Sequence, residues 1–218
     1  HPFADRIDDG LDPARVAFLA WQKARVGLRA EARQDLRRVA AEQTVPVRAF
    51  RLLTQLALGL DGTADALALI EAIDLHGRFD LGPTAHDADF DYAPGQALLA
   101  LAAAVRAGVV EDTYAVLPRA KAWCLRRFRL NHSHGAGPWL MQAFPEDAAE
   151  VAEHALRFQS KLDGAFLTGQ QDDCPGCTSL PPLEGLAAVY RARRTPALRR
   201  ALDDGLRFVD SLVYQPKD

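Results

Sequence analysis

The stretch Asp89-Phe-Asp-Tyr-Ala-Pro94-Gly-Gln-Ala-Leu-Leu-Ala-Leu101 decides the fold, because a polar loop runs here into a proline-opened apolar helix. The same design recurs downstream, where Pro138 and Pro182 follow at intervals of 44 residues. Proline is favoured at the first position of a helix, where its missing N–H costs nothing. We therefore predict an all-α fold of repeated antiparallel helix hairpins with a period of about 44 residues.

The bulk composition indicates a protein that buries a substantial core. The chain has 218 residues, of which 49% are hydrophobic, and we predict that residues 11–218 form a single domain after an extended N-terminal arm at residues 1–10. The formal net charge of -3 is spread without long single-sign blocks, so we expect no nucleic-acid partner. No apolar run approaches the roughly 20 residues that span a bilayer, so we expect a soluble protein without membrane contact. No signal peptide is recognisable, which slightly favours the cytoplasm, but a chain that begins at His1 leaves localisation open.

Apolar periodicity predicts nine or ten helices and almost no strand. Asp12 and Pro13 suit the cap and first residue of the first helix, and Pro46 opens another. The remaining helices are expected at about 31–43, 64–75, 111–130, 147–162 and 195–213, besides those that follow Pro94, Pro138 and Pro182. The side chains expected to be buried are Leu98, Leu99, Leu101, Leu140, Phe144, Leu156, Leu186, Val189, Leu202 and Leu206.

A second internal sequence similarity links alternate hairpins. Leu75-His-Gly77-Arg-Phe79 is similar to Leu162-Asp-Gly164-Ala-Phe166, and each lies before one of the recurring prolines. Glycine just after a helix is typical of a left-handed C-cap, and the phenylalanine two positions later can pack on the last helical turn. We therefore expect both copies to share a helix exit, a long loop and a helix entry.

At these Gly-x-Phe loops and at the helix openings Tyr92-Ala-Pro-Gly-Gln-Ala-Leu-Leu-Ala-Leu and Pro182-Leu-Glu-Gly-Leu-Ala-Ala-Val-Tyr, the chain resembles the six-hairpin α/α-toroid superfamily. That superfamily contains N-acylglucosamine 2-epimerase-like proteins and many glycoside hydrolases and lyases. The resemblance covers about residues 46–215 and implies an α/α toroid, or part of one, that acts on or binds a carbohydrate. A complete toroid has six hairpins and this chain offers four or five, so a protein partner or a missing segment would complete the ring. HEAT-type or armadillo-type arrays also fit the period, but their connections are mostly short.

Three polar segments precede first helices of hairpins, so we expect residues 77–93, 131–137 and 167–181 to emerge at one end of the array and form the site. Asp89, Asp91 and Glu184 are the candidate catalytic carboxylates, which would serve as general acid or base on a sugar. Capping of the following helices is the structural alternative for the two aspartates. The aromatic candidates suit stacking on a sugar ring or core packing, and the helical glutamines suit a cavity lining or an ordinary surface. The candidate substrate-binding residues are His86, Tyr92, Gln96, His134, Trp139, Gln142 and Gln170.

A cysteine pair adds a possible metal site. Cys174-Pro-Gly-Cys177 has the spacing of a zinc knuckle, and His132-Ser-His134 would complete a set of four ligands. A structural turn, a local disulfide and a redox role are alternatives for the pair. Cys124 falls within a helix and is expected to be a small buried hydrophobe. No cofactor is required by these patterns, and zinc is the one that they allow.

Two functions of different classes follow from the sequence. The first is a carbohydrate-binding or carbohydrate-active α/α-toroid protein, and the reaction would be that of a hydrolase, lyase or epimerase. The second is a helical-repeat module that binds another protein and uses any metal only for structure. A polar cavity enclosed by the three loops would favour the first function.

Overall fold

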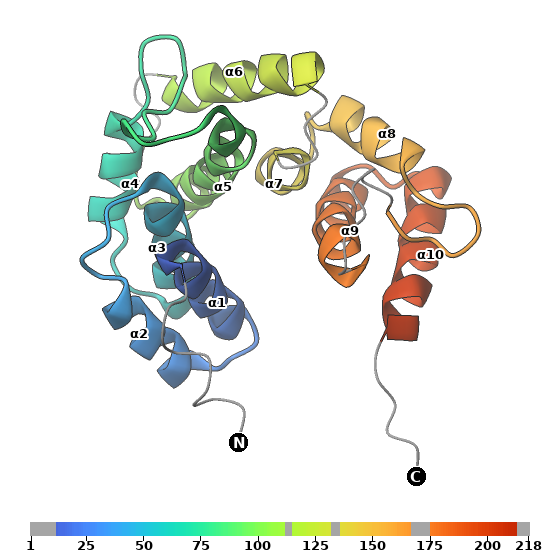
Figure 1. The fold of residues 1–218 in the computed structure, drawn as a ribbon, viewed down its shortest axis with the longest axis horizontal. Coiled ribbons are helices and arrows are strands. Elements are labelled where there is room, and N and C mark those ends of the chain that lie inside the picture. Colours follow the sequence, from blue (N-terminus) through green and yellow to red (C-terminus); the bar gives the residue numbers. More distant parts are fainter. Residues whose placement is uncertain (1–11, 112–114, 132–135, 167–174, 213–218) are drawn as a thin grey trace. The chain divides into compact units, whose positions relative to one another are not determined.

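The structure is a computed structural model that describes residues 12–111, 115–131, 136–166 and 175–212, and this part of the chain is all-helical (Figure 1). It has no β-strand there, only two isolated antiparallel bridges, Ile73 to Phe79 and Gln159 to Phe166. Ten α-helices and one 3-10 helix follow one another. They are α1 (Pro13–Arg25), α2 (Arg29–Arg38), α3 (Val45–Leu58), α4 (Thr63–Glu71), η1 (Asp87–Asp91), α5 (Ala93–Arg106), α6 (Val116–Asn131), α7 (Gly137–Ala143), α8 (Ala149–Arg157), α9 (Pro175–Ala192) and α10 (Pro196–Leu212).

The all-α prediction and the number of helices are confirmed for these residues. None of the described helices has the length and apolar character needed to cross a membrane. The chain forms two compact units, His1–Cys124 (unit 1) and Leu125–Asp218 (unit 2). The single domain expected from the sequence stays a prediction, and the arm at residues 1–10 lies outside the described residues.

Unit 1 has two layers of helices. Helix α3 packs between α1 and α5, while α2 and α4 return along α1 and α3 (Figure 1). The middle helix is apolar on most of its circumference, which is why it takes the central place. Phe50 of α3 stacks on Trp21 of α1, with ring centroids 5.8 Å apart, and also contacts Phe18 edge to face at 5.1 Å.

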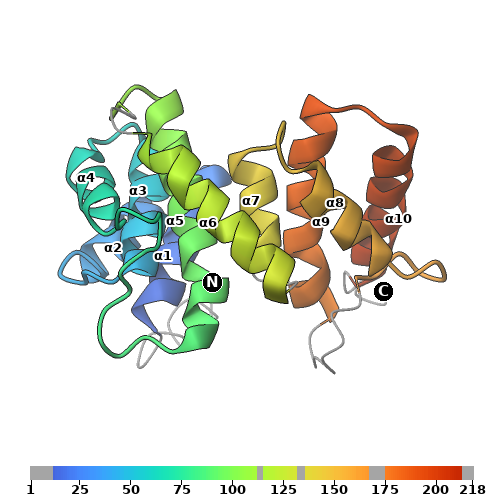
Figure 2. The ribbon, with the colours of Figure 1, turned by 90° about the horizontal axis from the view of Figure 1, so that it is seen from above.

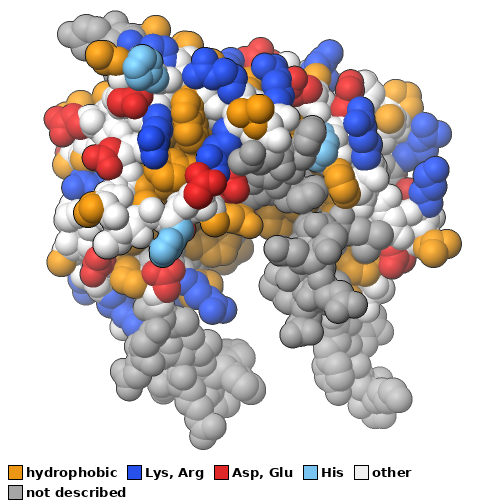
Figure 3. Space-filling model, turned by 45° about the horizontal axis from the view of Figure 1, so that its top comes forward, with side chains coloured by type: hydrophobic (Ala, Val, Ile, Leu, Met, Phe, Trp, Pro, Cys, Tyr) orange, Lys and Arg blue, Asp and Glu red, His pale blue; other side chains and the backbone are white. Residues whose placement is uncertain are grey.

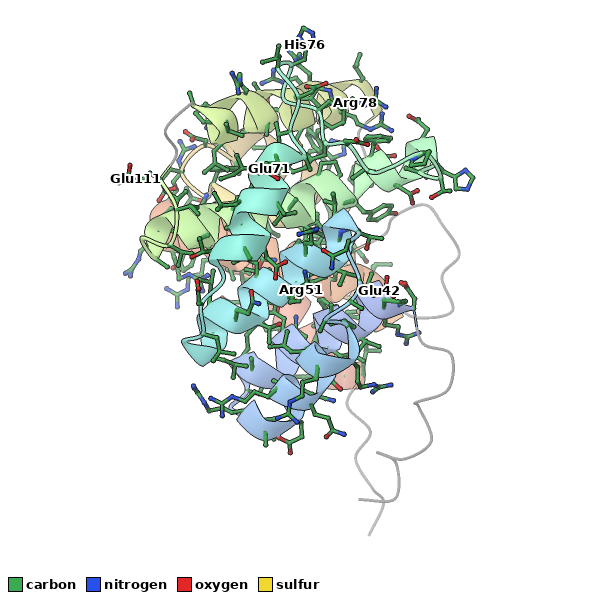
Figure 4. The ribbon with its side chains drawn as sticks, turned by 90° about the vertical axis from the view of Figure 1, so that its left-hand side faces the viewer. Glu42, Arg51, Glu71, His76, Arg78 and Glu111 are labelled. Atoms are coloured by element: carbon green, nitrogen blue, oxygen red, sulfur yellow. The ribbon has the colours of Figure 1, made fainter. Side chains whose placement is uncertain are left out.

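A buried ion pair joins α2, α3 and α4 of unit 1. Arg51 of α3 donates from Nε to Asp65 of α4 at 2.7 Å and from Nη2 to the other carboxylate oxygen. Its Nη1 donates to the carbonyl oxygens of Val39, Ala40 and Glu42 at 3.0, 3.2 and 2.8 Å, just beyond the end of α2. Figure 4 shows Arg51 among these helices with Glu42 beside it. One side chain therefore neutralises a buried carboxylate and satisfies carbonyls that the helix end leaves open.

Unit 2 repeats the layered arrangement. Helices α7 and α9 pack side by side, α8 covers both, and α10 packs along α9 (Figure 2). The core of this unit contains Phe128, Met141, Val151, Phe166, Leu183, Leu186 and Val189.

Proline opens most of the expected helices. Pro46, Pro94 and Pro138 are each the second residue of a helix. The expectation for Pro182 is wrong, because α9 begins at Pro175 and contains both Pro181 and Pro182 in its interior. The segment before them is held by packing: Ser179 is fully buried and its Oγ accepts the Phe166 N–H at 3.0 Å. Tertiary contact thus extends the helix past a residue that usually begins one.

The two Gly-x-Phe turns are similar but differ in length by one residue, since the bridge joins Ile73 to Phe79 in one and Gln159 to Phe166 in the other. Gly77 and Gly164 both have φ of 84°, and Phe79 and Phe166 are both buried. The expected C-cap role is wrong, because α4 and α8 end earlier, at Glu71 and Arg157, and the chain then forms an antiparallel bridge to the phenylalanine. The glycines have a packing role instead. A Cβ at Gly77 would strike the Arg119 carbonyl of α6, and one at Gly164 would strike the Asp204 carbonyl of α10.

Most of the residues expected in the core are buried. Leu206 is the exception, since 55% of its surface is exposed. Helix α10 packs through Leu198, Ala201 and Gly205, and Leu206 lies outside this face, next to the exposed Arg207. Phe144, Leu156 and Leu202 are half-buried.

Candidate functional site

The three loop segments of the expected site are described unequally. Residues 77–93 are described in full and belong to unit 1, whereas the other two segments belong to unit 2. Because the units are described separately, the expected convergence of all three segments stays a prediction. Four candidates lie outside the described residues: His132, His134, Gln170 and Cys174. The side chain of Cys177 lies outside them too, so the proposed zinc ligands remain a prediction.

The acidic segment of unit 1 forms the short helix η1. Asp89 accepts the His86 N–H at 2.7 Å through its carboxylate and donates its own N–H to the His86 carbonyl at 3.0 Å. The Asp89 carboxylate thus caps the start of η1 itself. The alternative to catalysis that the sequence offered was capping of the following helix, and Tyr92, the N-cap residue of α5, makes no side-chain cap bond. The His86 and Asp89 side chains are both exposed, so the cap does not prevent either from meeting a ligand.

The rest of this segment is anchored by an aromatic residue that sequence analysis did not single out. Phe90 is buried and meets Trp123 of α6 edge to face, with centroids 6.1 Å apart, while the Arg78 guanidinium lies 4.5 Å above its ring. Figure 4 places Arg78 on the turn after α4, beside η1. The signal that could have identified Phe90 in the sequence is an aromatic residue placed between two aspartates, Asp89 and Asp91. Asp91 and Gln96 are half-buried after this anchor, and Tyr92 is 53% exposed.

Three carboxylates of the described surface have pKa values held below their usual range, and all three build turns. A hydrogen bond from the Arg78 backbone is the main cause that lowers the pKa of Asp74. The Ser160 hydroxyl and the Ala165 N–H lower the pKa of Asp163 in the equivalent turn. The Thr63 hydroxyl and N–H do the same for the pKa of Asp61 before α4. These groups stabilise loops as ionised acceptors, which does not suit a general acid.

Unit 2 presents a different combination on its inner helices. In α7 nearly every residue is buried, and Trp139 and Gln142 are half-buried at a spacing of three, so they share one face. Several described residues of α9 are exposed or half-buried, and among them Leu180, Glu184, Ala187 and Arg191 recur at helical spacing on one face. The others are Pro181, Pro182, Tyr190 and Ala192. The contact between α7 and α9 is made by other residues, Pro138 and Met141 of α7 and Gly185 of α9.

The two helices approach most closely at Gly185. A Cβ there would lie 2.6 Å from Met141 Cε, 3.1 Å from Met141 Cβ and 3.2 Å from Pro138 Cα. Trp139 and Gln142 directly follow these two contact residues, and Glu184 directly precedes the glycine. The three side chains therefore start from backbone positions within about one helical turn of the closest contact. We call Trp139, Gln142 and Glu184 the α7–α9 patch.

Gln142 contributes an unusual atom to this patch. Its Nε2 is buried and has no hydrogen-bond partner in the structure. Buried amide donors are nearly always paired, because an unpaired one loses its bonds to water without replacement. Two buried polar atoms of unit 1, Gln55 Oε1 and Arg119 Nε, share this condition. Gln55 lines the packing site of Gly62 and Arg119 that of Gly77, and neither belongs to a set of candidate site residues.

Within the described part of the chain, no group of three or more His, Cys, Asp or Glu residues is placed so that it could hold a metal ion. Cys124 is buried, as expected from the sequence.

Comparisons with known proteins assign the chain to no protein family. No protein-family model matches it, and neither a curated protein nor a solved structure does. The described chain is therefore defined by its own fold and surface: an all-α protein of two-layered helix hairpins, with an aromatic and polar patch on the inner helices of unit 2.

Proposed function

We propose that the chain is a carbohydrate-binding protein of the helical-hairpin class, with the α7–α9 patch as the centre of its site. The observation that carries this proposal is the buried, unpartnered Gln142 amide on a pair of packed helices that also carries the half-buried Trp139 and Glu184. Because Nε2 is buried, the Gln142 side chain has to turn outward to meet a ligand. A ligand hydroxyl that then accepts from Nε2 would remove the cost of leaving this donor unsatisfied.

The chemistry of the patch suits a sugar. A pyranose ring has an apolar face that stacks on an aromatic ring, and its rim carries hydroxyls that both donate and accept hydrogen bonds. In the proposed complex the Trp139 ring covers the apolar face, Gln142 donates to one hydroxyl and Glu184 accepts from another. Small-molecule sites usually combine an apolar wall with a few placed polar groups in this way.

The arrangement of hairpins supports the wider proposal of an α/α toroid, or part of one, with a period of about 44 residues. Within each unit the odd-numbered helices pack side by side and the even-numbered helices lie outside them. The Gly-x-Phe turns pack in the same way on α6 and on α10.

In a catalytic version of the proposal, Glu184 serves as general acid or base, because it belongs to the patch and is half-buried. Asp91 is the second candidate carboxylate. Asp89 is less suited, since one of its oxygens already accepts the His86 N–H. The class of reaction stays that of a hydrolase, lyase or epimerase.

The proposal is tested by a glycan-array screen followed by calorimetric titration of the best sugar. Trp139→Ala should weaken binding about tenfold or more, in line with the 0.5–1.5 kcal/mol of ring stacking plus the lost buried area. Trp123→Ala is the matched control, because Trp123 is also half-buried but belongs to unit 1. Equal losses in the two variants would contradict the proposal.

Gln142→Met gives the sharper test, since it keeps the size of the side chain and removes the unpaired amide. We expect sugar affinity to fall while the melting temperature stays the same or rises, because the substitution removes a buried unsatisfied group. Gln34→Met on the exposed surface of α2 is the control. A lowered melting temperature with unchanged affinity would mean that Gln142 is structural, and the site would then have to lie elsewhere.

A further inference from the structure

The turn between α9 and α10 concentrates positive charge. Residues 191–200 contain five arginines and no acidic residue, in a chain whose formal net charge is -3. All five side chains are exposed, and Figure 2 shows the turn at the upper ends of α9 and α10. We call this set the arginine turn: Arg191, Arg193, Arg194, Arg199 and Arg200.

The arginine turn is poorly compensated. Arg199 Nε lies 3.8 Å from the Asp203 carboxylate, and the other four guanidinium groups have no ion pair or hydrogen bond within the described part of the chain. Helix α2 also contains four arginines, but Glu31 and Asp35 lie among them. Arg38 lies 3.6 Å from Asp35, and Arg29 donates to the Leu58 carbonyl at 2.7 Å. On the face that Figure 3 shows, both basic and acidic side chains are present.

Folding explains only part of this charge. Arg191, Arg193 and Arg194 lie at the end of α9, where cations interact favourably with the helix dipole. Arg199 and Arg200 instead follow within the first turns of α10, where the dipole disfavours cations. Like charges crowded on one turn also repel one another.

We propose that the arginine turn is a docking surface for an acidic segment of another protein. Carboxylates spaced along an extended peptide can each receive two parallel N–H bonds from a guanidinium group. Ala192, Thr195, Pro196 and Ala197 lie between the arginines and are small, so a peptide backbone can approach the turn closely.

Other anionic partners fit less well. Single-stranded nucleic acid is usually held by aromatic side chains as well as by charge, and residues 191–200 contain no aromatic residue. The negative net charge of the whole chain opposes a long polyanion more than a short acidic segment. The acidic segment of a second copy is also a poor fit, because Asp80 and Asp89 already accept backbone N–H groups of their own loop.

The experiment measures fluorescence anisotropy of a labelled ten-residue glutamate peptide mixed with the full chain. We expect binding that weakens between low and physiological salt, and no binding of a glutamine peptide of equal length. Arg193→Ala/Arg194→Ala should weaken it about tenfold, since each exposed charge pair contributes modestly. Arg33→Ala/Arg37→Ala, on the exposed face of α2, should leave it unchanged.

Arg193→Lys/Arg194→Lys keeps the charge and removes the paired donors, so it should weaken peptide binding by a smaller factor. The proposal is overturned if the α2 variant loses as much affinity as the turn variant. It is also overturned if a single-stranded DNA oligonucleotide binds more tightly than the peptide, or if sedimentation shows that the chain associates with itself through the turn. Sugar binding at the α7–α9 patch should be the same in every one of these variants.

Discussion

At the scale of single residues, Arg51 connects three helical segments of unit 1. It neutralises Asp65 and binds three carbonyl oxygens beyond α2, and both charged groups are buried. Arg51→Met should lower the free energy of unfolding by about 3–5 kcal/mol, because it leaves a buried carboxylate without its partner. Urea unfolding followed by circular dichroism measures this loss.

Arg48→Met is the matched control for Arg51. Arg48 lies on the same helix and its Nη1 is 3.8 Å from Asp65, but it makes no direct bond to that carboxylate. We expect a loss of less than about 1 kcal/mol from this variant. Comparable losses from Arg48 and Arg51 would show that Asp65 is stabilised by the general positive field and not by the bidentate pair.

Sequence reasoning could identify some of these residues and not others. Gln142 and Glu184 were recognisable as candidates because they are polar residues in apolar helical runs, and Trp139 because it is an aromatic residue at an expected junction of loop and helix. The burial of Arg51 was not recognisable, since Val47-Arg-Ala-Phe-Arg51 is equally typical of a helix with an exposed charged face. What buries it is the position of α2 and α4, which no local pattern contains. The same holds for the unpartnered Gln142 amide, whose state depends on how α7 packs in the folded unit.

At the scale of elements, the Gly-x-Phe turns decide how hairpins follow one another. Gly77→Ala and Gly164→Ala would each place a methyl group against a backbone carbonyl of the next outer helix, in a backbone conformation that L-residues rarely adopt. We expect each to destabilise the protein by about 2–5 kcal/mol, from the left-handed conformation together with overpacking. Thermal melting of the two variants measures the effect.

Gly82→Ala separates the two causes. Gly82 has φ of 88° but no atom within 4 Å of the added methyl group, so only the conformational cost remains. We expect this variant to lose about 1–2 kcal/mol. If Gly77→Ala costs no more than Gly82→Ala, the close approach of the turn to α6 does not contribute to stability.

Element boundaries were predicted best where local chemistry determines them. Asp12 caps α1 through the Ala14 N–H at 3.2 Å, and Pro46 and Pro94 open α3 and α5 as expected. The ends of α4 and α8 were placed too late, because the sequence remains apolar after the chain has left the helix for its bridge. Pro182 was wrongly assigned to a helix start, because nothing in the sequence shows that the helix already begins at Pro175. The bond from the Phe166 N–H to Ser179, which lies in the first turns of that helix, has no signal in the sequence.

At the scale of the whole molecule, each unit has its own core. The aromatic contact of Trp21 with Phe50 belongs to unit 1, while Phe128, Met141 and Leu186 form the centre of unit 2. The sequence predicted one domain from its length of 218 residues and its hydrophobic content of 49%, and that prediction is not yet tested. Composition reports how much surface can be buried, and it does not report into how many cores that surface is divided.

Separate cores predict that the two units open separately. Arg51→Met should lower the hydrogen-exchange protection of α2, α3 and α4 and leave α8, α9 and α10 as protected as in the parent chain, because local unfolding follows contiguous cooperative units. Gly164→Ala should do the reverse. The free-energy losses of the two substitutions should add in the double variant to within about 0.5 kcal/mol, as expected for residues without shared partners. Hydrogen exchange read by mass spectrometry resolves each helix in one experiment. Loss of protection in both units from either substitution would contradict this prediction and would support the single cooperative domain expected from the sequence.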